Sequence, residues 1–368
     1  MNQYKKFNIF ILMTTISKSM IELFIPIILF NKGLNFKEIL VFYLLKFSFL
    51  FIIENIIKLF KINNKTLIYL SSIVSIITYL ILYLYKSSFL HLIIISFLYS
   101  LYLSSYWIYR HNIALSIIED KKATDRSSIF MIITLIGLIP SSLLGGYIIN
   151  KFDFIYLIII VSILTFISLF FIIDIKNEKV KKRRIKYPFK NKLFLFLEQF
   201  KFITISLFPL FAYNQISNNY FYIGLLNTLT AVSSIIYIYI LAKFMDKNKK
   251  DYLNIMCTFL GITWAFKLIF LNKYIFLLIT LFEGVFKYAL DTIILRNIYS
   301  FGKNFNQLNY NVYIENIRNL SRIVILIIFL LFNINLNIII ITSIVCLFIS
   351  SFIKFDDGDA GYSKLKKT

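Results

Sequence analysis

The sequence predicts an all-α polytopic membrane protein with about twelve transmembrane helices in two pseudo-symmetric six-helix bundles. Hydrophobic residues make up 59% of the 368 positions and only 16% are charged, against about 25% in a soluble domain. Most apolar residues fall in runs of roughly 18 or more, long enough to cross the hydrocarbon layer as helices. A strongly basic segment, 176–192, divides the chain into two parts of similar length.

Twelve apolar spans follow one another along the chain and are mostly joined by very short connections. The first six are expected at 7–30, 36–60, 66–85, 89–116, 127–150 and 154–175. The last six are expected at 193–215, 219–243, 251–271, 274–297, 309–333 and 335–354. Short connections make neighbouring helices antiparallel. We expect an N-terminal bundle (1–175), a basic cytoplasmic linker (176–192), a C-terminal bundle (193–355) and a polar tail (356–368).

The net charge of +22 follows the rule of membrane insertion and does not indicate a nucleic-acid partner. Lysine and arginine lie mainly in alternate loops, which is the positive-inside pattern. Both termini are therefore expected in the cytoplasm, in a multi-pass protein of the cell membrane. We expect a bacterial protein that works as a monomer in the lipid bilayer.

The reactive residue types are too few or too scattered to predict an enzyme. Cys257 and Cys346 lie inside apolar spans, and the two histidines lack the spacing of metal ligands. Glycine is too sparse for a phosphate-binding loop, which excludes an ATP-driven pump acting alone. We expect no metal, no cofactor and no catalytic residue.

The two parts of the chain carry the same spacing of three residues. Span 1 contains Lys18, Pro26 and Asn31, and span 7 contains Lys201, Pro209 and Asn214 at the same two intervals. Chance is the alternative, but proline occurs only four times in the sequence, so we favour a true repeat. Six spans separate the copies, which predicts a pseudo-twofold axis along the membrane normal.

Two motifs add to this layout. Residues 242–250, Ala-Lys-Phe-Met-Asp-Lys-Asn-Lys-Lys, are similar to the Gly-x-x-x-Asp-Arg-x-Gly-Arg-Lys turn of the major facilitator superfamily, and Gly137–Gly146 is similar to its exporter signature. Over about residues 5–355 the chain resembles that superfamily. The resemblance implies a central cavity lined by spans 1, 4, 7 and 10. It also implies a cytoplasmic gate, for which the candidates are Asp246, Lys247, Lys250 and Arg126.

Charged residues inside membrane helices are costly and indicate function by default. Glu22 and Glu283 are candidate proton or cation sites, and Lys18 and Lys287, one turn away in each case, would tune them. The alternative is that each pair only neutralises itself during insertion, and for Glu54 with Lys58 we favour that alternative. The candidates for the substrate cavity are Arg110, Lys201, Tyr213, Asn214 and Asp291. Glu315, Arg318 and Arg322 are interpreted as locks between helices.

These observations favour a secondary active transporter that works by alternating access. The acidic candidates and the exporter-like motif favour proton-coupled efflux of an amphipathic or cationic small molecule or peptide. Three alternatives stay open. They are proton-coupled uptake of a small metabolite, a lipid-linked glycan flippase from another twelve-span superfamily, and a non-transporting receptor derived from the fold.

Overall fold

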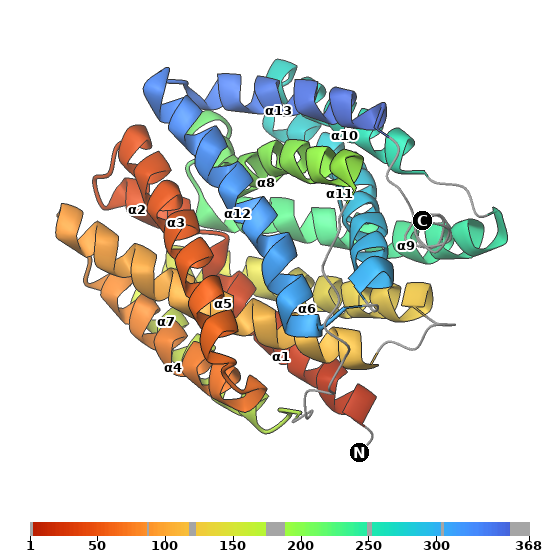
Figure 1. Ribbon diagram of the computed structural model, residues 1–368. Helices are drawn as coiled ribbons and strands as arrows, with labels where there is room; N and C mark the ends of the chain where they lie inside the picture. The colour runs from red at the N-terminus through yellow and green to blue at the C-terminus, as the bar shows by residue number, and fades with distance from the viewer. Residues whose placement is uncertain are drawn as a thin grey trace.

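The computed structural model describes residues 3–86, 88–117, 123–173, 188–248, 252–302 and 305–353. Within these ranges the regular structure is entirely α-helical, so the predicted fold class is confirmed (Figure 1). The N-terminal helices are α1 (Gln3–Glu22), α2 (Ile25–Asn31), α3 (Phe36–Phe60), α4 (Asn64–Tyr83), α5 (Phe89–Ile117), α6 (Ala123–Lys151) and α7 (Phe154–Leu169). The C-terminal helices are α8 (Phe189–Gln215), α9 (Tyr220–Asn248), α10 (Leu253–Ile269), α11 (Lys273–Gly302), α12 (Gln307–Leu331) and α13 (Leu336–Ser351).

Helices α1 and α2 together form the first span, so the described helices make up twelve spans. In the described residues, six spans are long and apolar enough to cross a membrane, and four shorter helices are also apolar. We call the side that carries Gln3 the N-terminal face. The side that carries the connection between Asn31 and Phe36 is the opposite face. Most of the expected linker and the whole expected tail lie outside the described residues.

The first span breaks where the sequence places a proline. Pro26 sits in the first turn of α2, and because it has no backbone N–H it cannot bond the carbonyl of Glu22. The chain turns at Phe24, whose N–H donates to the Ile21 carbonyl (2.9 Å). Pro209 lies inside the continuous helix α8 and Pro140 inside α6. Proline therefore interrupts the first span and leaves its counterpart, the seventh, as a single helix.

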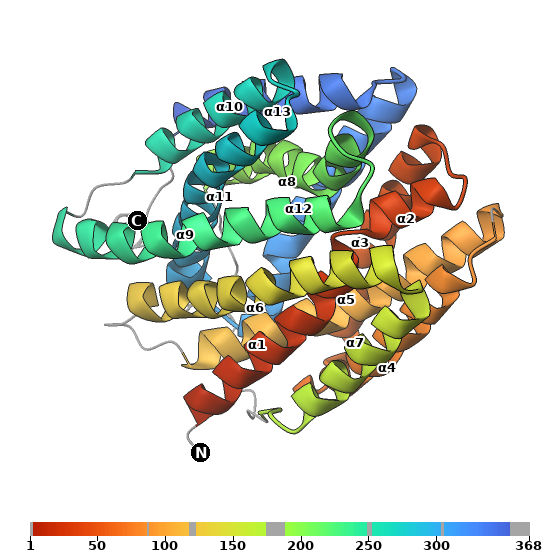
Figure 2. The same cartoon turned by 180° about the vertical axis from the view of Figure 1, so that it is seen from behind.

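Two sets of helices face each other across the molecule. Within one set, α1 packs on α6 and α7, and α5 packs on α3 and α4; within the other, α13 packs on α8 and α10. The sets meet along α6 with α9 and along α3 with α12. Figure 2 shows α6 beside α9, with α1, α4, α5 and α7 on one side of this contact and α10, α11 and α13 on the other.

Candidate functional site

A cavity of about 280 Å³ lies between the two sets of helices. Helices α3, α5 and α6 form one wall, and α8, α11 and α12 form the other. Aromatic and aliphatic side chains, including Phe47, Trp107 and Phe202, cover much of the lining. Its acidic and strongly basic side chains are Lys46, Glu54, Arg110, Glu198, Asp291, Glu315, Arg318 and Arg322. This concentration of charge inside a membrane bundle is typical of a substrate pathway.

On the wall formed by α8, α11 and α12, cations and carboxylates lie in contact. Lys201 Nζ lies 2.5 Å from Asp291 Oδ1 and 3.5 Å from Glu198 Oε1. Arg318 Nη1 lies 2.7 Å from Glu315 Oε1, and its Nη2 lies 3.9 Å from Glu198 Oε2. The structure thus brings together two predicted cavity residues, Lys201 and Asp291, of which only Asp291 lines the cavity. Two predicted locks, Glu315 and Arg318, line it as well.

Arg322, the third predicted lock, also lines this wall. Its Nε donates to Gln199 Oε1 (2.7 Å) and its Nη1 to Asn319 Oδ1 (3.0 Å). The guanidinium carbon lies 3.9 Å from the centroid of the Phe202 ring, at which distance a cation–π contact holds it. Arg322 is fixed by neutral groups from α8 and α12.

On the wall formed by α3, α5 and α6, Arg110 is held by hydroxyls and an indole ring. Its Nη2 donates to Thr134 Oγ1 (2.9 Å) and its Nη1 to Tyr106 Oη (3.4 Å). Its guanidinium carbon lies 5.0 Å from the centroid of the Trp107 ring. Arg110 therefore lines the cavity, as predicted for a substrate-cavity candidate, and its described partners are all neutral.

Lys46 is a cavity residue that the sequence analysis missed. Its Nζ lies 4.7 Å from the Tyr99 ring centroid, 5.1 Å from that of Phe47 and 5.2 Å from that of Tyr43. Among the described residues no carboxylate lies within ion-pair distance of it. A lysine in the middle of the apolar span 36–60 was the signal that could have identified it.

Lys18 and Glu22 lie at the end of α1, just before the break in the first span. Lys18 is 8% exposed, and its Nζ has no hydrogen-bond partner but lies 3.2 Å from the centroid of the Tyr106 ring. Glu22 Oε1 accepts a hydrogen bond from Tyr102 Oη (2.9 Å). The two residues do not form a contact ion pair, and the charge of Glu22 acts on both Lys18 and Lys46.

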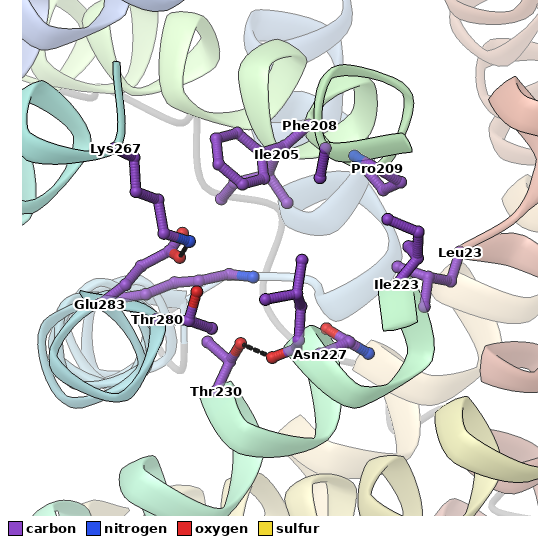
Figure 3. A pocket seen from close by; sticks show the side chains of 13 residues that line it. Leu23, Ile205, Phe208, Pro209, Ile223, Asn227, Thr230, Lys267, Thr280 and Glu283 are labelled. Atoms are coloured by element: carbon purple, nitrogen blue, oxygen red, sulfur yellow. Dashed lines mark hydrogen bonds and ion pairs between the residues drawn. The ribbon is translucent and has the colours of Figure 1, made fainter. Parts of the chain in front are cut away.

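A smaller cavity of about 70 Å³ lies among α8, α9, α10 and α11 (Figure 3). Glu283 lines it, together with Lys267 on the facing helix α10. The Glu283 carboxylate forms an ion pair with Lys267 and accepts a hydrogen bond from Trp264 Nε1 (2.9 Å). Lys287, the expected partner of Glu283, also lines this cavity, but the contact ion pair is with Lys267. A lysine within the apolar span 251–271 was the missed signal.

At the opposite face the two sets of helices are in contact. Asn31 Nδ2 donates to Tyr220 Oη (2.7 Å) and to Tyr213 Oη (3.1 Å). A methyl group at Gly146 on α6 would overlap the backbone of Tyr220 on α9, and one at Gly224 on α9 would overlap that of Ser142 on α6. The predicted cavity residue Tyr213 thus belongs to this closed face, and Asn214 is exposed there.

At the N-terminal face, amide side chains join the two sets of helices. Asn311 Nδ2 on α12 donates to Asn112 Oδ1 on α5 (2.9 Å), and Asn112 Nδ2 donates to Asn64 Oδ1 (3.0 Å). Asn55 and Asn316 exchange two hydrogen bonds (3.0 and 3.1 Å). Glu54, expected to pair with Lys58, instead accepts from Asn319 across the same interface.

The side chains of the predicted cytoplasmic gate, Asp246, Lys247, Lys250 and Arg126, lie outside the part of the chain that is described in such detail. The gate therefore stays a prediction. Within the described residues, no group of three or more His, Cys, Asp or Glu side chains could hold a metal ion.

The sequence and the fold were compared with those of known proteins. None of the curated proteins matches the sequence. Among solved structures, a bacterial homologue of the iron transporter ferroportin in an outward-facing state has 12% sequence identity and a TM-score of 0.65, covering 96% of this chain and 98% of the other. A second structure of such a homologue, with soaked iron, has 13% identity and a TM-score of 0.63 over the same shares. A bacterial metal transporter has 13% identity and a TM-score of 0.65, covering 96% and 97%.

At these identities the likeness to solved structures concerns the fold. The family is shown by the sequence itself, because the family model of the Major Facilitator Superfamily matches residues 8–310. This match covers the broken first span and the cavity lining from α3, α5, α6, α8 and α11, and it ends before the lining residues of α12. The chain therefore belongs to the major facilitator superfamily, and it is a multi-pass secondary transporter and not an enzyme.

Proposed function

We propose that the protein is a proton-coupled transporter of an amphipathic small molecule and that the 280 Å³ cavity is its substrate site. One observation carries this proposal: apolar rings and charged groups from both sets of helices line a single cavity. A site shared by two bundles is what alternating access requires, because rocking one bundle against the other exposes it to each side in turn. The lining suits a compound with both an apolar body and a polar group.

We place the coupling proton on Glu22. Its carboxylate has one described hydrogen-bond donor, Tyr102, and lies beside the break between α1 and α2. Glu283, the other candidate, has an ammonium on one oxygen and an indole N–H on the other. Protonating Glu283 would break a buried ion pair, whereas the described partner of Glu22 is the neutral hydroxyl of Tyr102.

Efflux is the direction that we propose, on the likeness of Gly137–Gly146 to the exporter signature. The glycines of this segment serve close packing here. A methyl group at Gly145 would overlap the backbone of Met20, while Gly146 faces α9. The lysines near the N-terminal face support a cytoplasmic position of that face in the cell membrane.

Metal transport is the activity named for the similar solved structures. We do not propose it for this chain. The carboxylates of the cavity wall formed by α8, α11 and α12 are already in contact with Lys201 and Arg318. The described residues also contain no cluster of metal ligands.

The proposal is tested in proteoliposomes that contain a pH-sensitive dye. Compounds that raise the Tm of the purified protein are added outside, and substrate-dependent proton movement is followed by the dye. We expect Glu22→Gln to bind substrate but to lose proton movement. Glu38→Gln is the matched control, because Glu38 is an exposed residue in the capping box at the start of α3.

Unchanged proton movement in Glu22→Gln would remove Glu22 from the mechanism. The absence of flux for every class of compound, together with tight binding of a partner protein, would favour the non-transporting receptor.

A further inference from the structure

The charges around the 280 Å³ cavity are balanced on one wall and unbalanced on the other. On the wall formed by α8, α11 and α12, the lining carboxylates of Glu198, Asp291 and Glu315 equal in number the cations Lys201, Arg318 and Arg322. Lys201 contacts two of these carboxylates without lining the cavity itself, and the described hydrogen-bond partners of Arg322 are neutral. On the other wall, the lining cations Lys46 and Arg110 outnumber the one lining carboxylate, Glu54, and Lys18 and Glu22 of α1 lie outside the lining. The surplus on this wall is therefore positive and belongs to α3 and α5.

The surplus cations are held by neutral groups. Aromatic rings surround Lys46, and Arg110 donates to two hydroxyls. Trp107 joins the group, because its ring centroid lies 5.0 Å from the Arg110 guanidinium and 5.3 Å from Lys18 Nζ. Rings and hydroxyls orient these cations but do not neutralise them, and uncompensated charge away from water is unfavourable.

A bound anion would compensate the surplus. A guanidinium has five N–H donors, and the two described hydrogen bonds of Arg110 leave others for a ligand. Its planar fork suits a carboxylate, which it can bind with two parallel hydrogen bonds. Around Arg110 the cavity offers Leu103, Met131 and Leu295, which suit an apolar body.

From this arrangement we infer that the transporter binds an amphipathic organic carboxylate, whose carboxylate contacts Arg110 and Lys46 and whose apolar body fills the rest of the cavity. This inference names a substrate class for the proposed function and depends on that proposal for its role in transport. It differs from the cationic compound expected from the sequence, because the carboxylates of the wall formed by α8, α11 and α12 are already in contact with Lys201 and Arg318.

Three compounds with one apolar body test the inference: cyclohexanecarboxylate, cyclohexylmethylamine and cyclohexylmethanol. Binding to the purified protein is measured by tryptophan fluorescence and by the shift in Tm, with no pH gradient. The sequence has two tryptophans; Trp107 lines the cavity and is 37% exposed, whereas Trp264 is fully buried. We expect the acid to bind at least about tenfold more tightly than the amine or the alcohol.

Variants assign the effect to the cations. Arg110→Gln should weaken acid binding about tenfold, and Lys46→Gln should weaken it less. Arg110→Lys should bind the acid with an affinity between those of Arg110→Gln and the natural protein, because lysine keeps the charge but lacks the planar fork. Lys151→Gln, an exposed position at the opposite face, is the control and should bind as the natural protein does. A merely structural role of Arg110 would change Tm without changing the preference for the acid over the alcohol.

The outcomes separate this inference from the proposed function. Tighter binding of the amine, equal binding of the three compounds, no acid binding, or unchanged acid binding in Arg110→Gln would overturn the inference and leave proton-coupled transport standing. Arg110-dependent binding of the acid, without flux of any compound in proteoliposomes, would support the inference and count against the proposed function.

Discussion

Lys18 and Lys201 occupy matched positions in the two halves but have opposite surroundings. Both are buried, at 8% and 2% exposure, and both precede a proline by eight residues. Lys201 lies 2.5 Å from Asp291 and 3.5 Å from Glu198. Among the described residues Lys18 Nζ has no hydrogen-bond partner, and it lies against aromatic rings. The same spacing of lysine, proline and asparagine in two spans thus does not determine the partners of the lysine, which come from neighbouring helices.

The different surroundings of Lys18 and Lys201 suggest different roles for the two halves of the protein. Around Lys201 the charges are satisfied within the protein, which favours one fixed arrangement of α8 and α11. Around Lys18 they are not, so a proton on Glu22 or a bound ligand changes the local balance. We infer that the N-terminal half responds to substrate and protons, and that the C-terminal half provides a stable counterpart.

The largest expected effect is on stability, at Lys201. Lys201→Met would leave Asp291 without its described cation and Glu198 with only its 3.9 Å contact to Arg318. Removing one partner of a buried ion pair costs about 3 kcal/mol. The measurement is the Tm of the purified protein in detergent. Adding Asp291→Asn should restore part of the loss, because one of the stranded carboxylates is then removed. An unchanged Tm in the single variant would show that this cluster is not held by its charges.

A smaller loss is expected at Tyr102. Tyr102→Phe removes the described donor to Glu22, and a hydrogen bond to a charged group contributes about 1.5 kcal/mol or more. Tyr79→Phe is the matched control, since its hydroxyl makes only a long contact of 3.4 Å to Tyr102. Equal losses in the two variants would mean that Glu22 is not specifically held by Tyr102.

The smallest effect is expected at Lys18. Lys18→Met loses cation–π contacts but also removes a buried ammonium without a partner, so the free energy of unfolding should change by less than about 1 kcal/mol. The same melting experiment decides this. A loss as large as that of Lys201→Met would remove the contrast between the two halves.

Much of the fold could be predicted from the sequence, because membrane spans are long and apolar. Every expected span has a helix at its place, and the break near Pro26 follows from the missing N–H of proline. The charges on spans 1, 4, 7 and 10 could also be identified as functional candidates from the sequence, since charges are rare inside membrane helices.

The contact partners of these charged residues could not be predicted from the sequence. Spacing along one helix suggested Glu283 with Lys287 and Glu54 with Lys58, yet their described partners are Lys267 and Asn319 from other helices. Such contacts depend on which helix faces which, and one sequence does not specify that. The aromatic contacts of Lys46 were hidden for a further reason: aromatic residues are 18% of the chain, so no ring stands out.

The amide contacts at the N-terminal face have a consequence for how the cavity opens on that side. Asn55 with Asn316, and Asn112 with Asn64 and Asn311, join α3, α4 and α5 to α12 through groups without net charge. Dissolved ions weaken interactions between charged groups by screening, but they have little effect on hydrogen bonds between neutral amides. Separation of these asparagines should therefore be insensitive to ionic strength, and an opening step that quickened with added salt would point to another contact as the barrier.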